Sequence, residues 1–336
     1  MSELAFLKDY NPAGRLVFAV VPGRSFLEMF EHIVEVTGRK IPNILVSMFY
    51  LRGSSGGEKL RRVRAMCDRL FIDSGVFSFR SKILSEEGMF FKAAYWTLSE
   101  DAKNKILEAG LRNKSYFDDF ADEYRRFLIT YGDVIDVAID LDVDQFLGLP
   151  IAEQYYQSML EVFPAEKIMR VWHSHGRDWG EWKEWCSSGK YKWLSLEGPD
   201  QHKRNVDMYN RFIDYAHQYG IKVHVLAVTT LQFMFQVALD TCDSSTYTVG
   251  GRYARLIMPD GRNILIGKGY KAIYENSFDR LPPSEREKVV KMMKYFGLTP
   301  EELTDDHMAR CLFNTLVFLV FYDKELRLQA STTTLF

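Results

Sequence analysis

Acidic residues stand at the ends of several predicted strands. Asp73 ends the segment RLFIDSG, and Asp140 and Asp142 end DVAIDLD. Glu197 comes near the end of KWLSLEG, and Asp243 follows the helical stretch after KVHVLAV. Carboxylates that meet at one place repel each other and raise each other's pKa, so a structure that gathers several of them indicates a catalytic or binding site. Each acid alone has a structural alternative, because an Asp after a strand is a common N-cap of the next helix.

The acids belong to an alternating pattern of strands and helices. Most strand segments are continuous apolar runs, which is typical of strands buried on both faces. Strands are predicted at 16–23, 43–50, 69–75, 136–142, 168–174, 192–198, 222–228 and 242–247. Helices are predicted at 25–38, 114–132, 151–164, 205–220 and 230–242, with two more at 282–298 and 299–326. The alternation predicts βαβ units around a parallel sheet.

The number of these units predicts a (β/α)8 TIM barrel with a C-terminal helical region. We expect the barrel domain over 1–275 and the helical region, packed on the barrel, over 276–336. A doubly wound open sheet is the alternative, but no glycine-rich dinucleotide fingerprint follows a predicted strand. In a TIM barrel the catalytic residues lie at the C-terminal ends of the strands, where the acids stand in this sequence.

The composition is that of an ordinary globular protein. Of the 336 residues 47% are hydrophobic and 26% charged, which excludes disordered and collagen-like classes. The net charge is −2, so any nucleic-acid contact must come from local basic segments. The four cysteines form no CxxC pair, which argues against a disulfide framework or a zinc knuckle. Without a secretory signal or a membrane-length apolar run, we expect a cytoplasmic protein, in the host cytoplasm if it is viral.

Five short motifs resemble segments of the tRNA-guanine transglycosylases, in the order that this family has. FIDSGVFSF (71–79) is similar to the DSGGFQ motif, VAIDLDV (137–143) to the AFDEC segment, and VHVLAVTT (223–230) to the LMGVG strand. VWHSHG (171–176) takes the place of the VQGG segment. ALDTCDSSTYTVGGRYAR (238–255) resembles IDMFDCVxPTRxxR, with Asp243 at the FDC aspartate.

The resemblance implies the exchange of guanine for a 7-deazaguanine within a nucleic acid. It assigns the nucleophile to Asp243, which would bond C1′ and stabilise its positive charge. It assigns the acid and base to Asp73, which would protonate the leaving base and deprotonate the incoming one. Asp140 would accept the two adjacent donors of the guanine edge. The other base-binding residues implied are Ser74, Gly75, Phe77, His173, Gly198 and Leu226.

Some of these residues have ordinary structural alternatives. Phe77 and Leu226 would enclose the flat base, but Phe and Leu at strand ends are more often core residues. Gly198 would contact the carbonyl oxygen of the base, or it is a turn glycine.

The chain departs from the family pattern in three places. The cysteines and histidine that hold the family's structural zinc are missing, so we expect no zinc and no other cofactor. His173 and Ser174 replace the amide of VQGG, and a metal at His173 and His175 is disfavoured because no other His or Cys clusters with them. Glu197 stands where the family has glycine, which leaves the preferred 7-substituent open.

Two basic segments are predicted to contact phosphates. KLRRVRAMCDR (59–69), predicted as a helix, provides Arg61, Arg62 and Arg64, with a solvated helix face as the alternative. Arg252 and Arg255 follow the nucleophile.

The missing zinc segment and the DSS in place of DCV resemble the DNA-modifying branch of this superfamily, often encoded by bacteriophages. The predicted function is therefore a pentosyltransferase that inserts a preQ0-like 7-deazaguanine into DNA, with DNA and the free base as partners and no membrane. The alternatives are a tRNA enzyme of the same chemistry, a glycoside hydrolase with two carboxylates, and an inactive nucleic-acid-binding subunit. The oligomeric state stays open.

Overall fold

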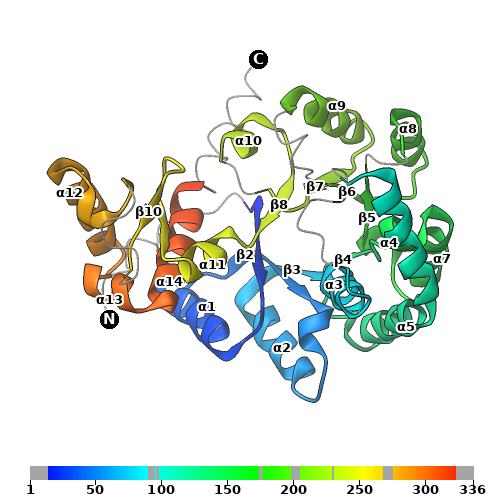
Figure 1. Cartoon of the computed structure of the whole chain (residues 1–336), viewed down its shortest axis with the longest axis horizontal. Coiled ribbons are helices and arrows are strands. Elements are labelled where there is room, and N and C mark those ends of the chain that lie inside the picture. Colours follow the sequence, from blue (N-terminus) through cyan, green and yellow to red (C-terminus); the bar gives the residue numbers. More distant parts are fainter. Residues whose placement is uncertain are drawn as a thin grey trace.

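Eight parallel strands close into a barrel (Figure 1). The computed structural model describes residues 14–89, 95, 98–173, 177–197, 205–228, 231–267 and 275–322. The strands are β1 (Leu16–Val20), β2 (Ile41–Ser47), β3 (Cys67–Asp73), β4 (Val137–Ile139), β5 (Ile168–Trp172), β6 (Trp193–Leu196), β7 (Lys222–Val225) and β8 (Thr241–Ser244). Each strand pairs with the next, and β8 closes the ring on β1, with Asp243 opposite Val17. The predicted (β/α)8 barrel is confirmed.

Helices follow the strands and cover the outside of the barrel. They are α1 (Arg24–Thr37), α2 (Gly56–Met66), α3 (Val76–Glu86), α4 (Glu100–Arg112), α5 (Lys114–Tyr131), α6 (Asp144–Leu147), α7 (Leu149–Leu160), α8 (Trp179–Ser187), α9 (Val206–His217), α10 (Leu231–Gln236) and α11 (Thr246–Arg252). Short 3-10 turns lie at Met48–Leu51, Ala165–Lys167 and Phe278–Arg280. In the described part of the chain, no helix combines the length and apolar character that a membrane crossing requires.

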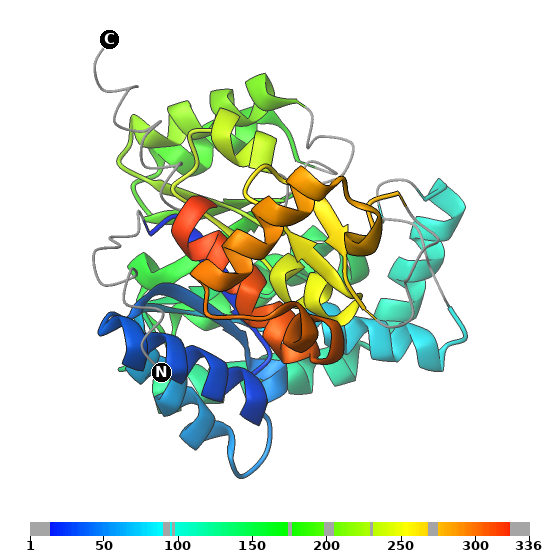
Figure 2. The same cartoon turned by 90° about the vertical axis from the view of Figure 1, so that its left-hand side faces the viewer.

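The chain after α11 forms a small unit on one flank of the barrel. It consists of the antiparallel pair β9 (Arg255–Ile257) and β10 (Asn263–Leu265), then α12 (Pro283–Tyr295), α13 (Pro300–Asp305), α14 (His307–Val317) and the π-helix Phe318–Tyr322. α14 contacts α11, β9 and α1, and Figure 2 shows the C-terminal helices against this side of the barrel.

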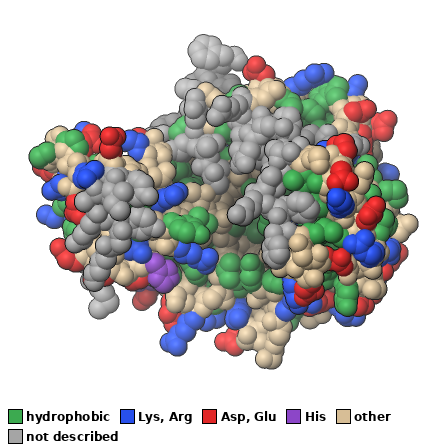
Figure 3. Space-filling model, viewed as in Figure 1, with side chains coloured by type: hydrophobic (Ala, Val, Ile, Leu, Met, Phe, Trp, Pro, Cys, Tyr) green, Lys and Arg blue, Asp and Glu red, His purple; other side chains and the backbone are tan. Residues whose placement is uncertain are grey.

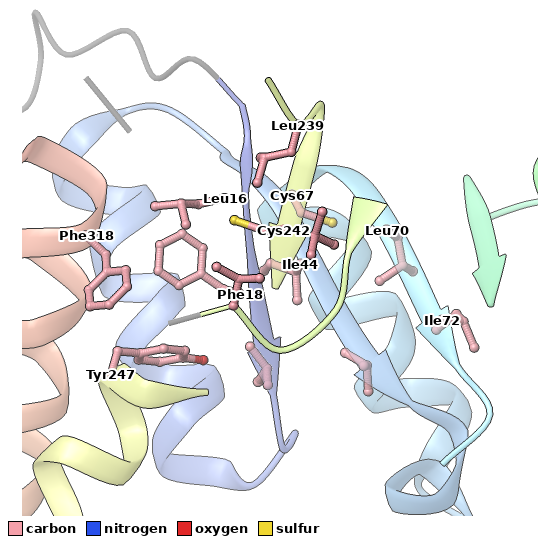
Figure 4. Packing of buried hydrophobic residues seen from close by; sticks show 14 of the residues in the cluster. Leu16, Phe18, Ile44, Cys67, Leu70, Ile72, Leu239, Cys242, Tyr247 and Phe318 are labelled. Atoms are coloured by element: carbon pink, nitrogen blue, oxygen red, sulfur yellow. The ribbon is translucent and has the colours of Figure 1, made fainter. Parts of the chain in front are cut away.

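The strands are apolar on both faces because both faces are covered. On β1, Val17 belongs to the barrel interior, whereas Leu16 and Phe18 belong to the layer between strands and helices. Figure 4 shows this outer layer, in which the rings of Phe18 and Tyr247 meet edge-on at 5.4 Å. Phe71 fills the interior from β3, so Asp73, two residues further along, points the same way. The alternation of the strand therefore delivers this acid to the barrel mouth.

Four predicted elements end at other residues in the structure. The helix predicted over 59–69 ends at Met66, because Cys67–Asp73 pairs along its length with β2. The helix predicted over 230–242 ends at Gln236, and the strand predicted over 242–247 is β8, which is followed at once by α11. The tail helix predicted over 299–326 divides at Asp306, whose side chain caps α14.

One buried asparagine ties α14 to the barrel side. The amide nitrogen of Asn314 donates to the carbonyl oxygens of Tyr247 and Arg255, both at 3.1 Å. Its Oδ1 accepts the N–H of Ile257 at 2.8 Å. Three backbone groups on α11 and β9 thus depend on a single side chain.

Asn314→Ala is expected to lower the free energy of unfolding by about 3 kcal/mol, because buried polar groups lose their partners. Urea unfolding followed by circular dichroism measures this. The control is Asn276→Ala, whose exposed amide bonds only the carbonyl of Asn263 and should cost less than about 1 kcal/mol. Equal losses in the two variants would contradict this role for Asn314.

Candidate active site at the barrel mouth

Asp73 ends β3 and is followed by a tight turn. Gly75 has a φ of +82°, and a Cβ there would lie 2.2 Å from Oγ of Ser47, so no other residue fits. The N–H of Gly75 donates to Oδ2 of Asp73 at 3.0 Å. The hydroxyl of the buried Ser74 accepts the N–H of Val76 at 3.3 Å. The turn therefore fixes the position of the Asp73 carboxyl.

Asp243 lies on β8 and is held by groups from β7 and the loop after it. Nε2 of His224 lies 3.3 Å from Oδ1 of Asp243, and the N–H of Ala227 donates to the same oxygen at 2.7 Å. Nδ1 of the buried His224 lies 2.9 Å from the hydroxyl of Thr241, so a proton on Nε2 satisfies both contacts. Two donors therefore converge on one carboxylate oxygen of Asp243.

Ala227 presents its N–H from a strained backbone conformation. Its φ is +53°, in the left-handed region that residues other than glycine seldom adopt. Strain of this kind persists where the surrounding structure over-determines it, and it concentrates at functional sites.

Asp73 and Asp243 have unlike surroundings. Burial raises the pKa of Asp73 from 3.8 to about 7, and the charges of Asp142 and Asp243 add to the rise. Asp73 therefore keeps its proton up to about neutral pH. Close to it lies the carboxylate of Asp243, which accepts hydrogen bonds from two donors. A protonated and an ionised carboxyl in one site can act as general acid and nucleophile.

A second group, here called the acid–histidine cluster, consists of Asp142, Asp144, His173 and Glu197 at the ends of β4, β5 and β6. Nδ1 of His173 lies 3.0 Å from Oδ2 of Asp144. Nε2 lies 3.2 Å from Oδ1 of Asp142 and 3.3 Å from Oε2 of Glu197. Asp142, Asp144 and His173 offer ligand atoms within 4.8 Å of one another, so the cluster is a candidate metal site.

The charges of the cluster shift the pKa values of its members. Burial lowers the pKa of His173, but the charges of Asp142 and Asp144 outweigh it and raise this pKa well above 6.5. Burial raises the pKa of Glu197 to about 7, helped by the charges of the same two acids.

Two residues of α3, Phe77 and Arg80, lie beside the acids. The guanidinium of Arg80 lies between the rings of Phe77 and Phe146, at 4.4 and 4.5 Å from their centroids. It donates to Oε1 of Gln145 at 3.2 Å, and its charge reaches Asp142, Asp144 and Glu197. Phe77 is 66% exposed, so it is not a core residue and its ring is accessible for stacking.

The structure brings most of the residues expected at the site to the mouth. They are Asp73, Ser74, Gly75, Phe77, His173, Leu226 and Asp243. Leu226 is half-buried and packs on the barrel interior. Asp140 is buried and accepts the N–H of Val171 at 3.2 Å, so its carboxyl lies between β4 and β5. Gly198, Ser174 and His175 lie outside the described residues.

The two basic segments lie in different places. Arg64 donates to the carbonyl oxygens of Cys67 and Asp68, which begin β3, so it lies at the end of the strand opposite to Asp73. On the same helix, Arg62 pairs with Glu31 of α1 at 2.8 Å and Arg61 is exposed. Arg252 and Arg255, in contrast, are exposed on the elements that follow β8.

Several site residues were not expected from the sequence. His224 lies in the middle of β7. A polar residue at an inward-facing position of a strand is the one sequence signal that could have indicated it. Asp144 and Arg80 lie on helices, and Ala227 contributes only its backbone, so no residue pattern marks them.

No protein-family model matches the chain, and no curated protein matches it. Among solved structures, it is similar to a putative dehydratase from Mesorhizobium loti, at 10% identity and a TM-score of 0.38. The alignment covers 68% of this chain and 54% of that chain, so this chain spans about half the length of that protein. The class therefore follows from the barrel itself: the protein is a TIM barrel with a buried group of acids and a histidine at its mouth, an arrangement that suggests an enzyme.

Asp73→Asn is expected to stabilise the protein at pH 8 and to have little effect at pH 4. The folded protein keeps a proton that the unfolded chain releases near pH 4, so this acid lowers stability progressively between pH 4 and about 7. Each unit of pKa corresponds to about 1.4 kcal/mol, so the gain at pH 8 should be about 1 to 4 kcal/mol. Urea unfolding at both pH values measures it, and an equal effect at pH 4 and 8 would contradict the raised pKa.

Proposed function

We propose that this protein exchanges guanine for a 7-deazaguanine in DNA through a covalent intermediate on Asp243. The observation that carries the proposal is the pair of unlike carboxyls, with Asp243 bound by two donors and Asp73 protonated near neutral pH. The order and position of the transglycosylase-like motifs support the identity of the base.

The two carboxyls supply both half-reactions. A carboxylate oxygen of Asp243 attacks C1′ of the target nucleotide, and the bond between C1′ and N9 of guanine breaks with its electron pair going to the base. Asp73 gives its proton to the departing guanine. The incoming 7-deazaguanine then loses its N9 proton to Asp73 and attacks C1′, which releases Asp243. The exchange balances without a cofactor or an oxidant.

The surroundings of the two acids suit a flat base. The exposed ring of Phe77 offers a stacking surface three residues after Ser74, and stacking of a base on an aromatic ring contributes about 1–3 kcal/mol. Leu226 stands next to Ala227, whose N–H holds Asp243. In the proposed complex, the base stacks on Phe77 with its sugar toward Asp243.

DNA binding must rely on local contacts. In Figure 3, acidic and basic side chains are interspersed over the face shown, and hydrophobic side chains border a hollow near its centre. Arg252, Arg255 and the exposed Tyr253 between them can contact phosphates and a base near Asp243. DNA is preferred to tRNA because the zinc segment of the tRNA enzymes is missing from the sequence.

A glycoside hydrolase is the second candidate, because the same pair of carboxyls suits a retaining hydrolase. Incubation with labelled guanine and equal amounts of duplex DNA and tRNA separates the possibilities. Label in DNA supports the proposal, and label in tRNA alone corrects the polymer. Cleavage of an aryl glycoside without label in either polymer would favour the hydrolase.

Asp243→Asn is expected to abolish base exchange, at least about a thousandfold, because the amide can neither bond C1′ nor offset its charge. Incorporation of labelled guanine measures the rate. The control is Asp240→Asn, since this carboxyl binds the N–H of Val223 and His217 at the other end of β7. Exchange within tenfold of wild type in Asp243→Asn would move the nucleophile to another acid.

Arg252→Glu with Arg255→Glu is expected to weaken DNA binding and to lower its salt slope by about one unit per lost phosphate contact. The triple change of Arg61, Arg62 and Arg64 to Glu serves as a comparison on another helix, α2, where Arg64 reaches the start of β3 and Arg62 pairs with Glu31. Fluorescence anisotropy at several salt concentrations measures both. A larger loss in the triple variant would place the polymer along α2.

A further inference from the structure

We propose that the acid–histidine cluster binds one divalent transition-metal ion, Mn²⁺ or Zn²⁺, through His173, Asp142 and Glu197. Asp144 would orient the histidine. This site lies at β4 to β6, beside Asp73, and it does not depend on the proposed base exchange. The sequence predicts no metal here, because no other His or Cys clusters with His173 and His175. Carboxylates take the place of those ligands in the proposed site.

Glu197 is the observation that points to a ligand. It is only 8% exposed, and neither of its carboxylate oxygens accepts a hydrogen bond from a described residue. Oδ1 of Asp142 likewise lacks a hydrogen-bond donor. Both carboxylates are aimed at the same ring nitrogen of His173. Buried carboxylates without donors are strongly unfavourable, and a cation between them would satisfy the oxygens together.

The two distances measured from Nε2 of His173 are compatible with a shared metal ion. Metal bonds to imidazole and carboxylate are about 2.1 Å long, so neighbouring ligand atoms are about 3.0 Å apart at right angles and about 3.4 Å apart in a tetrahedron. Nε2 of His173 lies 3.2 Å from Asp142 and 3.3 Å from Glu197, within this interval. A single proton on Nε2 can point to one of these oxygens, whereas a metal ion binds both.

The opposite side of the ring has the partner that a metal-binding histidine requires. Nδ1 of His173 lies 3.0 Å from Oδ2 of Asp144, which fixes the ring and leaves Nε2 to face the metal. The charges of three carboxylates of the cluster act on the guanidinium of Arg80. A divalent cation would cancel the two negative charges that remain when the histidine is neutral.

The types of the ligands determine which metal ion is preferred. The exposure of the cluster leaves coordination positions open for a substrate. One imidazole with carboxylates suits Mn²⁺ or Zn²⁺, while Mg²⁺ and Ca²⁺ prefer oxygen ligands alone. The side chain of Asp142 is 31% exposed, so the cluster is open on its side. Asp144 also lines a cavity of about 330 Å³ with Lys103 and Tyr95. Oxygen atoms of a bound substrate can occupy the remaining coordination positions there.

The test is metal binding by the full chain after treatment with a chelator. Isothermal titration with Mn²⁺, Zn²⁺ and Mg²⁺, each alone, and electron paramagnetic resonance of bound Mn²⁺ give affinity and stoichiometry. We expect one equivalent of Mn²⁺ or Zn²⁺ and much weaker Mg²⁺ binding. Glu197→Gln and Asp142→Asn should each weaken binding by more than about tenfold. Both variants should stay folded, because Oδ1 of Asp142 and both carboxylate oxygens of Glu197 accept no hydrogen bond from the described residues.

Glu301→Gln is the control, because this acid lines a separate cavity in the C-terminal unit. Its affinity should equal that of wild type. No binding tighter than about 1 mM by wild type would overturn the proposal. So would equal affinities in wild type, Glu197→Gln and Asp142→Asn. The titration has its own readout, so loss of base exchange in the labelled-guanine assay leaves this result unaffected.

Discussion

Parallel closure of the barrel brings the ends of all eight strands to one side, and the acids that follow several of them must share that space. Burial and mutual repulsion raise the pKa values of Asp73, Asp140 and Glu197 to about 7. These acids therefore keep their protons, or bind cations, at a pH at which the same side chains would be ionised in water. Its other features, from the glycine turn after Asp73 to the position of Arg80, compensate for this constraint.

The mouth divides into two halves with different electrostatics. Around Asp243, backbone and histidine N–H groups face a single carboxylate oxygen. Around Glu197, no described residue donates a hydrogen bond to the carboxylate, which lies close to the charges of His173 and Arg80. In the proposed functions, the first half bonds the sugar and the second half holds a metal ion.

Rigid packing below and beside the mouth makes these placements possible. The interior of the barrel is filled by large side chains, among them Phe71 and Trp193, whose rings meet edge-on at 5.7 Å. On the flank, Asn314 fixes α14 against α11, which directly follows the strand of Asp243. A strained residue such as Ala227 keeps its conformation only where the elements around it cannot relax.

The sequence by itself determined the barrel, because strands covered on both faces must be apolar throughout and must alternate with helices of sufficient length. It also located Asp73 and Asp243, since residues at strand ends follow the strand's alternation. It did not determine where helices stop: Cys67 and Asp68 continue a helical pattern, but pairing with β2 draws them into β3. Only the tertiary structure decided which acids meet.

Asp140 lies between two strands, whereas Asp142 and Asp144, in the segment that follows, reach His173. Likewise Arg64, near the end of α2, reaches the start of β3 at the end of the strand opposite to Asp73, and Arg62 pairs with Glu31 of α1. The physical reason is that a local sequence pattern reports only which side chains of one helix or strand are buried and which way they point. Contacts between side chains from different strands and loops are set by the closure of the whole barrel.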